Sequence, residues 1–167
     1  MTIGVVAKLK IKAGQEAAFK AVFGALQAAE VDFTIFVRTL AALDAAAVVD
    51  PVAALEPALY DRAKAEREAA TLADWLARYA TRLASDPQTA DERRARMDAA
   101  NPWVVPRNWL LQQAIDAAEQ GDTAELHALL DVLQRPYEAQ PGAQRFAARR
   151  PAWAKDRPGC SALSCSS

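Results

Sequence analysis

Apolar residues recur every three or four positions through most of this sequence, and this helical spacing limits the fold more than any other feature. In residues 58–84 the spacing is carried by a stripe of large side chains: Leu72, Trp75, Leu76, Tyr79 and Leu83. Alanine makes up 40 of the 167 residues and favours helix, because it gives up no side-chain entropy there. We therefore expect a mainly α fold with a thin core, since alanine adds little apolar area.

Capping residues, glycine and proline mark where the helices begin and end. Thr89 and Glu92 fit a capping box, in which each side chain satisfies the other's free amide, and Asp122 with Glu125 resembles a second one. Gly121 suits a left-handed cap between two helices, which predicts an antiparallel hairpin. The predicted helices cover residues 31–40, 58–84 (continuous or broken near Thr71), 89–100, 106–120 and 122–135, with a connector or a short irregular helix over 44–57.

The N-terminal segment follows a different pattern. Residues 3–11 are rich in β-branched side chains and alternate apolar residues with lysine, which predicts one short strand, and an amphipathic helix follows Gly14. A strand needs a partner for its backbone groups, and no second strand can be recognised. Residues 1–24 resemble the first strand and helix of antibiotic-biosynthesis-monooxygenase-like proteins, which implies a dimeric ferredoxin-like barrel.

The C-terminal segment is rich in proline, glycine, arginine and serine and contains both cysteines, Cys160 and Cys165. Spaced hydrophobic residues could hold it as an extended tail on a surface. The sequence thus predicts three parts: a βα head over 1–24, a helical domain over 25–135 and an extended Arg/Pro-rich tail over 136–167.

Charge and hydropathy exclude several classes of protein. The net charge of −1 lacks the basic excess of a nucleic-acid binder, and no apolar run approaches the ~20 residues that span a bilayer. The N-terminus has no signal-peptide pattern, so we expect a cytoplasmic protein. His127, the only histidine, has no partner at metal-ligand spacing, and we predict no catalytic, cofactor-binding or metal site in this chain.

One segment concentrates unusual residues at the entrance of a helix. It holds the five residues predicted to form a structural joint: Asn101, Pro102, Arg107, Asn108 and Trp109. In this interpretation Asn108 or Asn101 caps the helix amides, while Trp103 and Trp109 fill the core.

The same segment carries a family resemblance. The run Asn-Pro-x-x-Val-x-Arg-Asn-Trp-Leu-x-Gln-x-Ala-Ile, then Leu-Leu-x-Val-Leu-x-Arg-Pro-Tyr and the ending Ser-Cys-Ser-Ser, resembles the selenoprotein O family, also called the YdiU family. The resemblance covers about residues 25–167. It implies a kinase-like fold that transfers AMP from ATP, with Mg²⁺, to Ser, Thr or Tyr hydroxyls of substrate proteins.

In this family the catalytic lysine, the metal ligands and the glycine-rich loop lie in the N-terminal and central parts. The matching region is the C-terminal helical part, so we expect a fragment that is inactive alone and binds neither ATP nor Mg²⁺. The resemblance also implies a redox role for Cys165, which pairs with a cysteine near the family's active site; Cys160 is a possible substitute within this chain.

Two other functions stay open at this stage. One is a non-catalytic, redox-sensitive interaction module that docks on a kinase-like lobe through residues 145–153 and Cys165. The other is a small ferredoxin-like monooxygenase, which depends on residues 1–24 alone.

Overall fold

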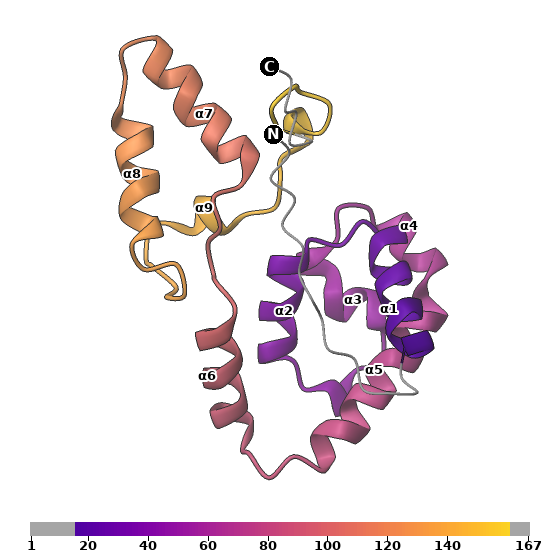
Figure 1. The fold of residues 1–167 in the computed structure, drawn as a ribbon. Helices are drawn as coiled ribbons and strands as arrows, with labels where there is room; N and C mark the ends of the chain where they lie inside the picture. The colour runs from indigo at the N-terminus through magenta and orange to yellow at the C-terminus, as the bar shows by residue number, and fades with distance from the viewer. Residues whose placement is uncertain (1–15, 161–167) are drawn as a thin grey trace. The chain divides into compact units, whose positions relative to one another are not determined.

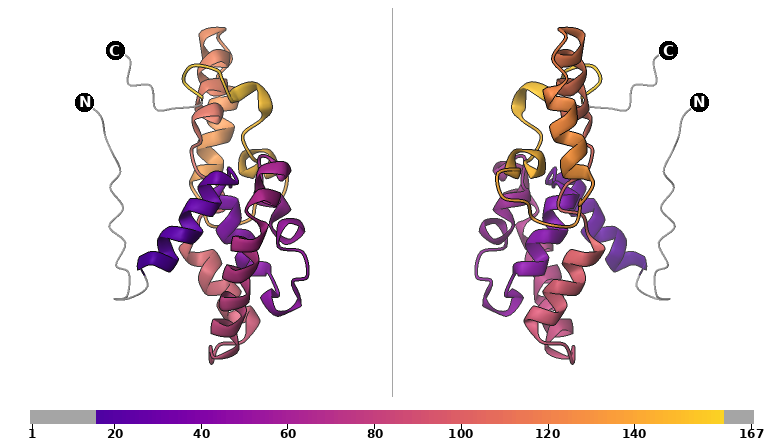
Figure 2. Two further views of the ribbon diagram at one scale, coloured as in Figure 1. Left: turned by 90° about the vertical axis from the view of Figure 1, so that its right-hand side faces the viewer. Right: turned by 90° about the vertical axis from the view of Figure 1, so that its left-hand side faces the viewer.

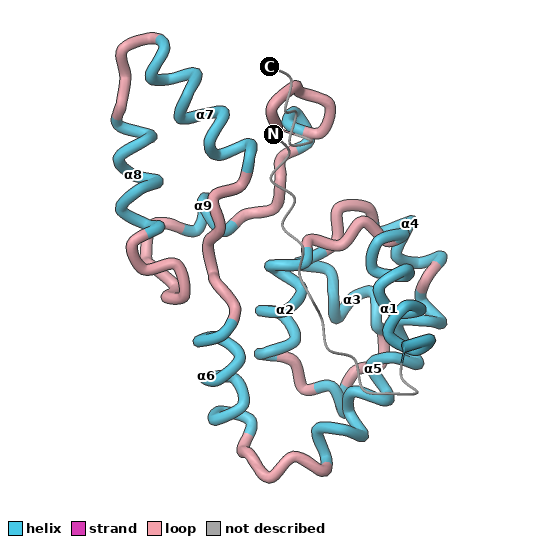
Figure 3. Tube along the Cα trace, viewed as in Figure 1, coloured by secondary structure: helices cyan, strands magenta, loops and turns pink. Residues whose placement is uncertain are grey.

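The computed structural model describes residues 16–160, and all regular structure in this range is helical (Figures 1 and 3). The mainly α fold is therefore confirmed, and the predicted strand over 3–11 lies outside the described residues. The α-helices (α) and 3-10 helices (η) are α1 (Glu16–Ala28), α2 (Phe33–Ala42), η1 (Ala45–Ala47), α3 (Pro51–Leu55), η2 (Glu56–Ala58), α4 (Arg62–Arg67), α5 (Ala69–Ala84), α6 (Ala90–Ala100), α7 (Asn108–Glu119), α8 (Ala124–Leu133), α9 (Gln144–Ala147) and η3 (Ala152–Ala154).

The described residues separate into two compact units, each with its own hydrophobic core. The N-terminal unit comprises residues 16–99 and the C-terminal unit residues 100–160. The boundaries predicted from the sequence, at residues 24 and 135, differ from this one. Which core a helix joins depends on contacts between distant residues, and these are not written in the helical spacing.

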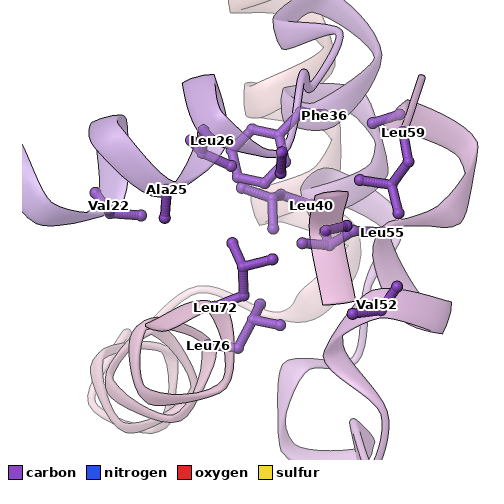
Figure 4. Close-up of a cluster of buried hydrophobic side chains, with 13 residues drawn as sticks. Val22, Ala25, Leu26, Phe36, Leu40, Val52, Leu55, Leu59, Leu72 and Leu76 are labelled. Carbon is purple, nitrogen blue, oxygen red and sulfur yellow. The ribbon is translucent and has the colours of Figure 1, made fainter. Parts of the chain in front are cut away.

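The core of the N-terminal unit lies where α1, α2, α3 and α5 meet (Figure 4). Leu55 and Leu72 are completely buried there, and Figure 4 shows side chains of all four helices pointing into the same space. The labelled members are Val22, Ala25, Leu26, Phe36, Leu40, Val52, Leu55, Leu59, Leu72 and Leu76. Most of them are leucine or valine, which confirms that larger side chains do the packing in this alanine-rich chain.

Helix α2 confirms that the β-branched run over 31–40 folds as a helix. The buried Asp32 carboxylate caps it by accepting a hydrogen bond from the Ile35 amide at 3.1 Å. The same carboxylate accepts a 2.6 Å hydrogen bond from the Tyr60 hydroxyl, so the cap is tied to a residue 28 positions away. The only approach to strand pairing in the described part of the chain is one antiparallel bridge between Val31 and Leu59.

The predicted helical stretch over 58–84 is divided into separate helices. Asp61 starts α4 by accepting from the Lys64 amide at 3.2 Å. Glu68 then donates its amide to the Ala65 carbonyl only three residues back, which tightens the last turn of α4 and ends it before α5 begins at Ala69. The break therefore lies at Glu68, three residues before the position suggested by the sequence.

Helix α6 begins at the predicted capping box. The Glu92 amide donates to the Thr89 hydroxyl at 3.2 Å, and the Thr89 amide donates to the Glu92 carboxylate at 2.9 Å. The bonds that the Thr89 amide and hydroxyl donate to the Glu92 carboxylate lower the pKa of Glu92 below its usual value. No residue of α6 is fully buried, and the helix is held by Met97, which packs against the core of the N-terminal unit, and by the Arg38–Asp98 ion pair at 3.2 Å.

The C-terminal unit is built on the predicted hairpin of α7 and α8, which lie side by side in the views of Figures 1 and 2. Gly121 has φ +86° and makes the left-handed turn between the two helices. The second capping box was a wrong prediction. The Asp122 carboxylate accepts from the Ala124 amide at 2.8 Å, two residues on, and the N-cap residue is Thr123, whose side chain makes no capping bond. Glu125 is drawn instead to Arg145, 20 residues further on.

Residues 136–160 fold onto the hairpin rather than forming the extended tail that the composition suggested. They contain α9 and η3 and bury four residues in the second core, Ala143, Phe146, Ala154 and Cys160. Their spacing along the chain is irregular, which is why no helical or strand pattern revealed their burial.

Candidate functional site

The joint before α7 is held by backbone hydrogen bonds to the far end of the hairpin. The amides of Trp103 and Val104 both donate to the Pro136 carbonyl, at 2.7 and 3.1 Å. The Val104 side chain is a member of the second core, at 1% exposure. The segment that enters α7 and the segment that leaves α8 are thereby fixed to one another, which closes the open end of the hairpin.

The cap of α7 differs from the prediction. Arg107 occupies the N-cap position in an extended conformation, no side chain caps the helix, and Asn108 is its first helical residue. Asn101 and Pro102 follow the last residue of α6 and lie half-buried. Asn108 therefore does not occupy the cap position, and the Arg107 carbonyl receives the Leu110 amide at 2.9 Å.

Trp109 confirms the prediction of a tryptophan in the core. Its side chain is 7% exposed and meets the Trp153 ring edge-on, with ring centroids 6.5 Å apart and an angle of 88°. The indole Nε1 of Trp109 is buried and has no hydrogen-bond partner among the described residues. Trp103 is half-buried against the same core.

A strap, defined here as residues 144–157, is fastened to one side of the hairpin by two ion pairs. Arg145 contacts Glu125 of α8 at 2.6 Å, and Arg157 contacts Asp116 of α7 at 2.7 Å. The hydrogen bond that Gln112 donates to Asp116 lowers the pKa of that carboxyl, and Arg157 lowers it further.

An open pocket of about 540 Å³ lies between the strap and the hairpin. The half-exposed side chain of Trp153 forms part of its wall. The lining contains these two ion pairs, so its arginines are already neutralised by carboxylates. The arrangement is suited to fixing the strap, and it leaves no uncompensated charge of the kind that would hold a phosphate.

Cys160 lies in the second core at 5% exposure with its thiol free. The preceding Gly159 has φ +81°, and a side chain there would approach Gln112 Oε1 to 2.5 Å. Cys165, the other predicted redox residue, lies outside the described residues. A buried Cys160 is poorly placed to exchange with another thiol unless the strap moves, and the redox role of both cysteines stays a prediction.

The remaining candidates for chemistry lie apart from one another. His127 is exposed on α8, and its Nδ1 lies 2.8 Å from the Thr123 carbonyl. Across residues 16–160 no three His, Cys, Asp or Glu side chains converge so that they could hold a metal ion. In the same range, none of the helices combines the length and the apolar character needed to cross a bilayer.

The two ion pairs and Gly159 were not among the predicted site residues. Pro158-Gly159 is an ordinary turn signal that could have suggested a tight turn before Cys160. The ion pairs join residues 20 and 41 positions apart and leave no local signal.

These observations define an all-helical protein region in which the distinctive residues serve packing and fastening. Comparison with known proteins places it more closely: the family model described as protein adenylyltransferase SelO matches residues 3–134. The chain belongs to this family.

Curated relatives agree with the family match. The chain is 52% identical over 147 residues to the protein nucleotidyltransferase YdiU of Azoarcus sp. strain BH72, covering 88% of this chain and 28% of that protein. It is 52% identical over 143 residues to the protein of the same name from Aromatoleum aromaticum, and 51% identical over 142 residues to that of Xanthomonas axonopodis pv. citri. Each of these alignments covers 85% of this chain and 27% of the relative. The chain thus spans little more than a quarter of the length of these relatives.

The family match also corrects one sequence-based prediction. It begins at residue 3, so it includes nearly all of the head over 1–24 that was expected to be unlike the rest. The likeness of that head to small monooxygenases rested on a single βα unit, which many unrelated folds contain. The match leaves the monooxygenase alternative without support.

Proposed function

We propose that this chain is the helical region of a protein adenylyltransferase, which transfers AMP from ATP to hydroxyl groups of substrate proteins. The main support for this proposal is the family match over residues 3–134, together with 52% identity over 147 residues to a protein nucleotidyltransferase. Identity at that level over most of the chain leaves little room for a different architecture. The role of the region is to support a nucleotide-binding lobe rather than to do chemistry itself.

The location of the chemistry follows from what the residues can hold. Adenylyl transfer needs ATP phosphates clamped by basic groups and a divalent ion held by carboxylates. The residues at hand do not fit that task, because residues 16–160 bring no three metal-binding side chains together, and Arg145 and Arg157 are occupied by carboxylates. We therefore assign no step of the transfer to this region, and ATP and Mg²⁺ belong to the rest of the longer family proteins.

The test is a chimera in which this chain's matched 147 residues replace those of the Azoarcus relative. The chimera should transfer AMP from labelled ATP to a protein acceptor, detected by mass spectrometry, because the helical region is exchanged for a close homologue. The 167-residue chain alone should transfer none.

Two outcomes would contradict the proposal. AMP transfer by the chain alone would show that it contains its own catalytic groups. A chimera that is folded and binds ATP but transfers nothing would show that these helices do not serve an adenylyltransferase.

A further inference from the structure

The α7–α8 hairpin has a second side, which carries large aliphatic residues that stay partly exposed in the described part of the chain. Leu111 and Ile115 of α7 are 39% and 49% exposed, and Leu126 and Leu130 of α8 are 36% and 51% exposed. We call these four side chains the aliphatic face. In the adjacent core, by contrast, Leu110 and Leu129 are each 1% exposed.

Helix geometry gathers the four side chains on one side of the hairpin. Leu111 and Ile115 are four residues apart, as are Leu126 and Leu130, so each pair lies along one line of its helix. Asp116 and Glu125 hold the strap on the other side. At about 100° per residue, Leu111 and Ile115 are some 140° and 100° from Asp116 around α7, and Leu130 and Leu126 are equally far from Glu125 around α8. The aliphatic face is therefore turned away from the two carboxylates that hold the strap.

The size of the face argues against a stable dimer of this chain. Four partly exposed aliphatic side chains present on the order of 300 Å², the scale of the largest apolar patch on an ordinary monomer, and such patches are often functional. A stable interface between two separate molecules buries about 800 Å² on each partner. Interfaces between parts of one chain start near 600 Å² counted over both sides, which a face of this size can supply.

The longer family proteins contain further chain that could form such an interface within one molecule. The chain covers 28% of the Azoarcus protein, so nearly three quarters of such a protein lies outside the matched region. We infer that the aliphatic face is the docking surface by which this helical region packs against the remaining chain of the longer family proteins. The inference rests on the proposed function, and it deepens it by naming the contact residues Leu111, Ile115, Leu126 and Leu130.

The aliphatic character of the face also indicates what kind of surface it packs against. Two helices that present aliphatic side chains at i, i+4 spacing are received by an apolar groove or helix face. The opposing surface on the remaining chain is therefore apolar and uncharged at its centre.

Hydrogen exchange tests the contact in two settings. In the chimera described above, the amides of α7 and α8 should exchange at least about tenfold more slowly than in the isolated 167-residue chain, because docking suppresses local opening. The double variant L126Q/L130Q should abolish this difference in the chimera while leaving exchange in the isolated chain unchanged. Glutamine suits the test because it keeps helix propensity and adds no charge.

A matched control is V49Q, which changes a 97% exposed aliphatic side chain of the N-terminal unit. It should leave exchange in α7 and α8 unchanged in both settings. If the chimera does not fold, the same comparison is made between the intact Azoarcus protein and its matched 147 residues, where protection of the hairpin should again appear only in the intact protein.

The outcomes separate this inference from the proposed function. Equal exchange in the isolated chain and in an active chimera would overturn the docking surface and leave the function standing. Slow exchange in a folded chimera that transfers no AMP would overturn the proposed function and leave the docking surface standing. Concentration-dependent dimerisation of the isolated chain in sedimentation, lost in L126Q/L130Q, would assign the face to a second copy and overturn the inference.

Discussion

Gly159, two residues beyond the strap, affects how the strap is attached to α7. Its φ of +81° is costly for any residue with a side chain, and its missing Cβ leaves space for the Gln112 amide. Gln112 uses that position to donate to Asp116 at 3.0 Å, and Asp116 in turn holds Arg157. A side chain at position 159 would therefore displace Gln112 from the position in which it donates to Asp116.

We predict that Gly159→Ala destabilises the C-terminal unit more than Gly142→Ala does. Gly142 has almost the same φ, +82°, but nothing lies within 4 Å of its absent Cβ, so its substitution should cost about 1 kcal/mol for backbone strain alone. Gly159→Ala should cost about 1 kcal/mol more, because Gln112 must release Asp116. Urea denaturation of both variants measures the difference, and equal losses would refute the role given to Gln112.

Among the elements, the strap and the hairpin depend on each other through charge. The Asp116 pKa is lowered in the folded state, so its carboxylate stabilises the fold at pH values above the unfolded value of about 3.9. That contribution disappears as the pH falls through the lower, folded pKa. The attachment of the strap is therefore acid-sensitive, and neutral pH keeps it in place.

We predict that Asp116→Asn lowers stability at pH 7 and flattens its dependence on pH below about 4. Fluorescence of Trp109 and Trp153 during urea denaturation at pH 7 and at low pH reports the effect, since both rings lie beneath or on the strap. Asp131→Asn on the exposed surface of α8 is the control. A variant as steeply pH-dependent as the parent would show that Asp116 does not link the strap to pH.

For the whole molecule, two separate cores imply two units that unfold in response to different changes. Leu72 is 0% exposed in the core of the N-terminal unit, and Leu129 is 1% exposed in that of the C-terminal unit. The two clusters share no residue among those described. Damage to one core therefore removes no buried contact from the other.

We predict that Leu72→Ala and Leu129→Ala each destabilise their own unit by about 2–5 kcal/mol, the usual cost of a leucine-sized cavity. Hydrogen exchange should accelerate over residues 16–99 in the first variant and over residues 100–160 in the second. Leu126→Ala, on the exposed surface, should have a small effect in the isolated chain. Acceleration of both units by either substitution would mean that the chain unfolds as one body.

Much of the secondary structure could be predicted because its signals are local. The Thr89–Glu92 box formed as expected, since its partners are three residues apart and meet as soon as the first turn exists. Gly121 ended α7 for an equally local reason, its tolerance of φ +86°. The second box failed where a distant partner competed, because Arg145 draws Glu125 away from the start of α8.

The candidate site was predicted in part. The burial of Trp109 could be expected from an aromatic residue on the apolar side of a helix, but the cap at Arg107 could not, since asparagine is the better capping residue. The burial of Cys160 depends on the strap, whose attachment to Asp116 spans 41 residues. No window of sequence short enough to show periodicity contains both partners.

The sequence by itself determined that this chain is helical, where most of its helices begin and end, and which family it resembles, because propensity, caps and i, i+4 spacing act within a few residues. Only the tertiary structure decided that residues 100–160 share a core and that the C-terminal segment folds back as a strap. It also decided that Leu126 and Leu130 stay partly exposed while Leu129 is buried. These outcomes depend on which distant surfaces exclude water from one another, and that choice is made by the packing of the whole chain.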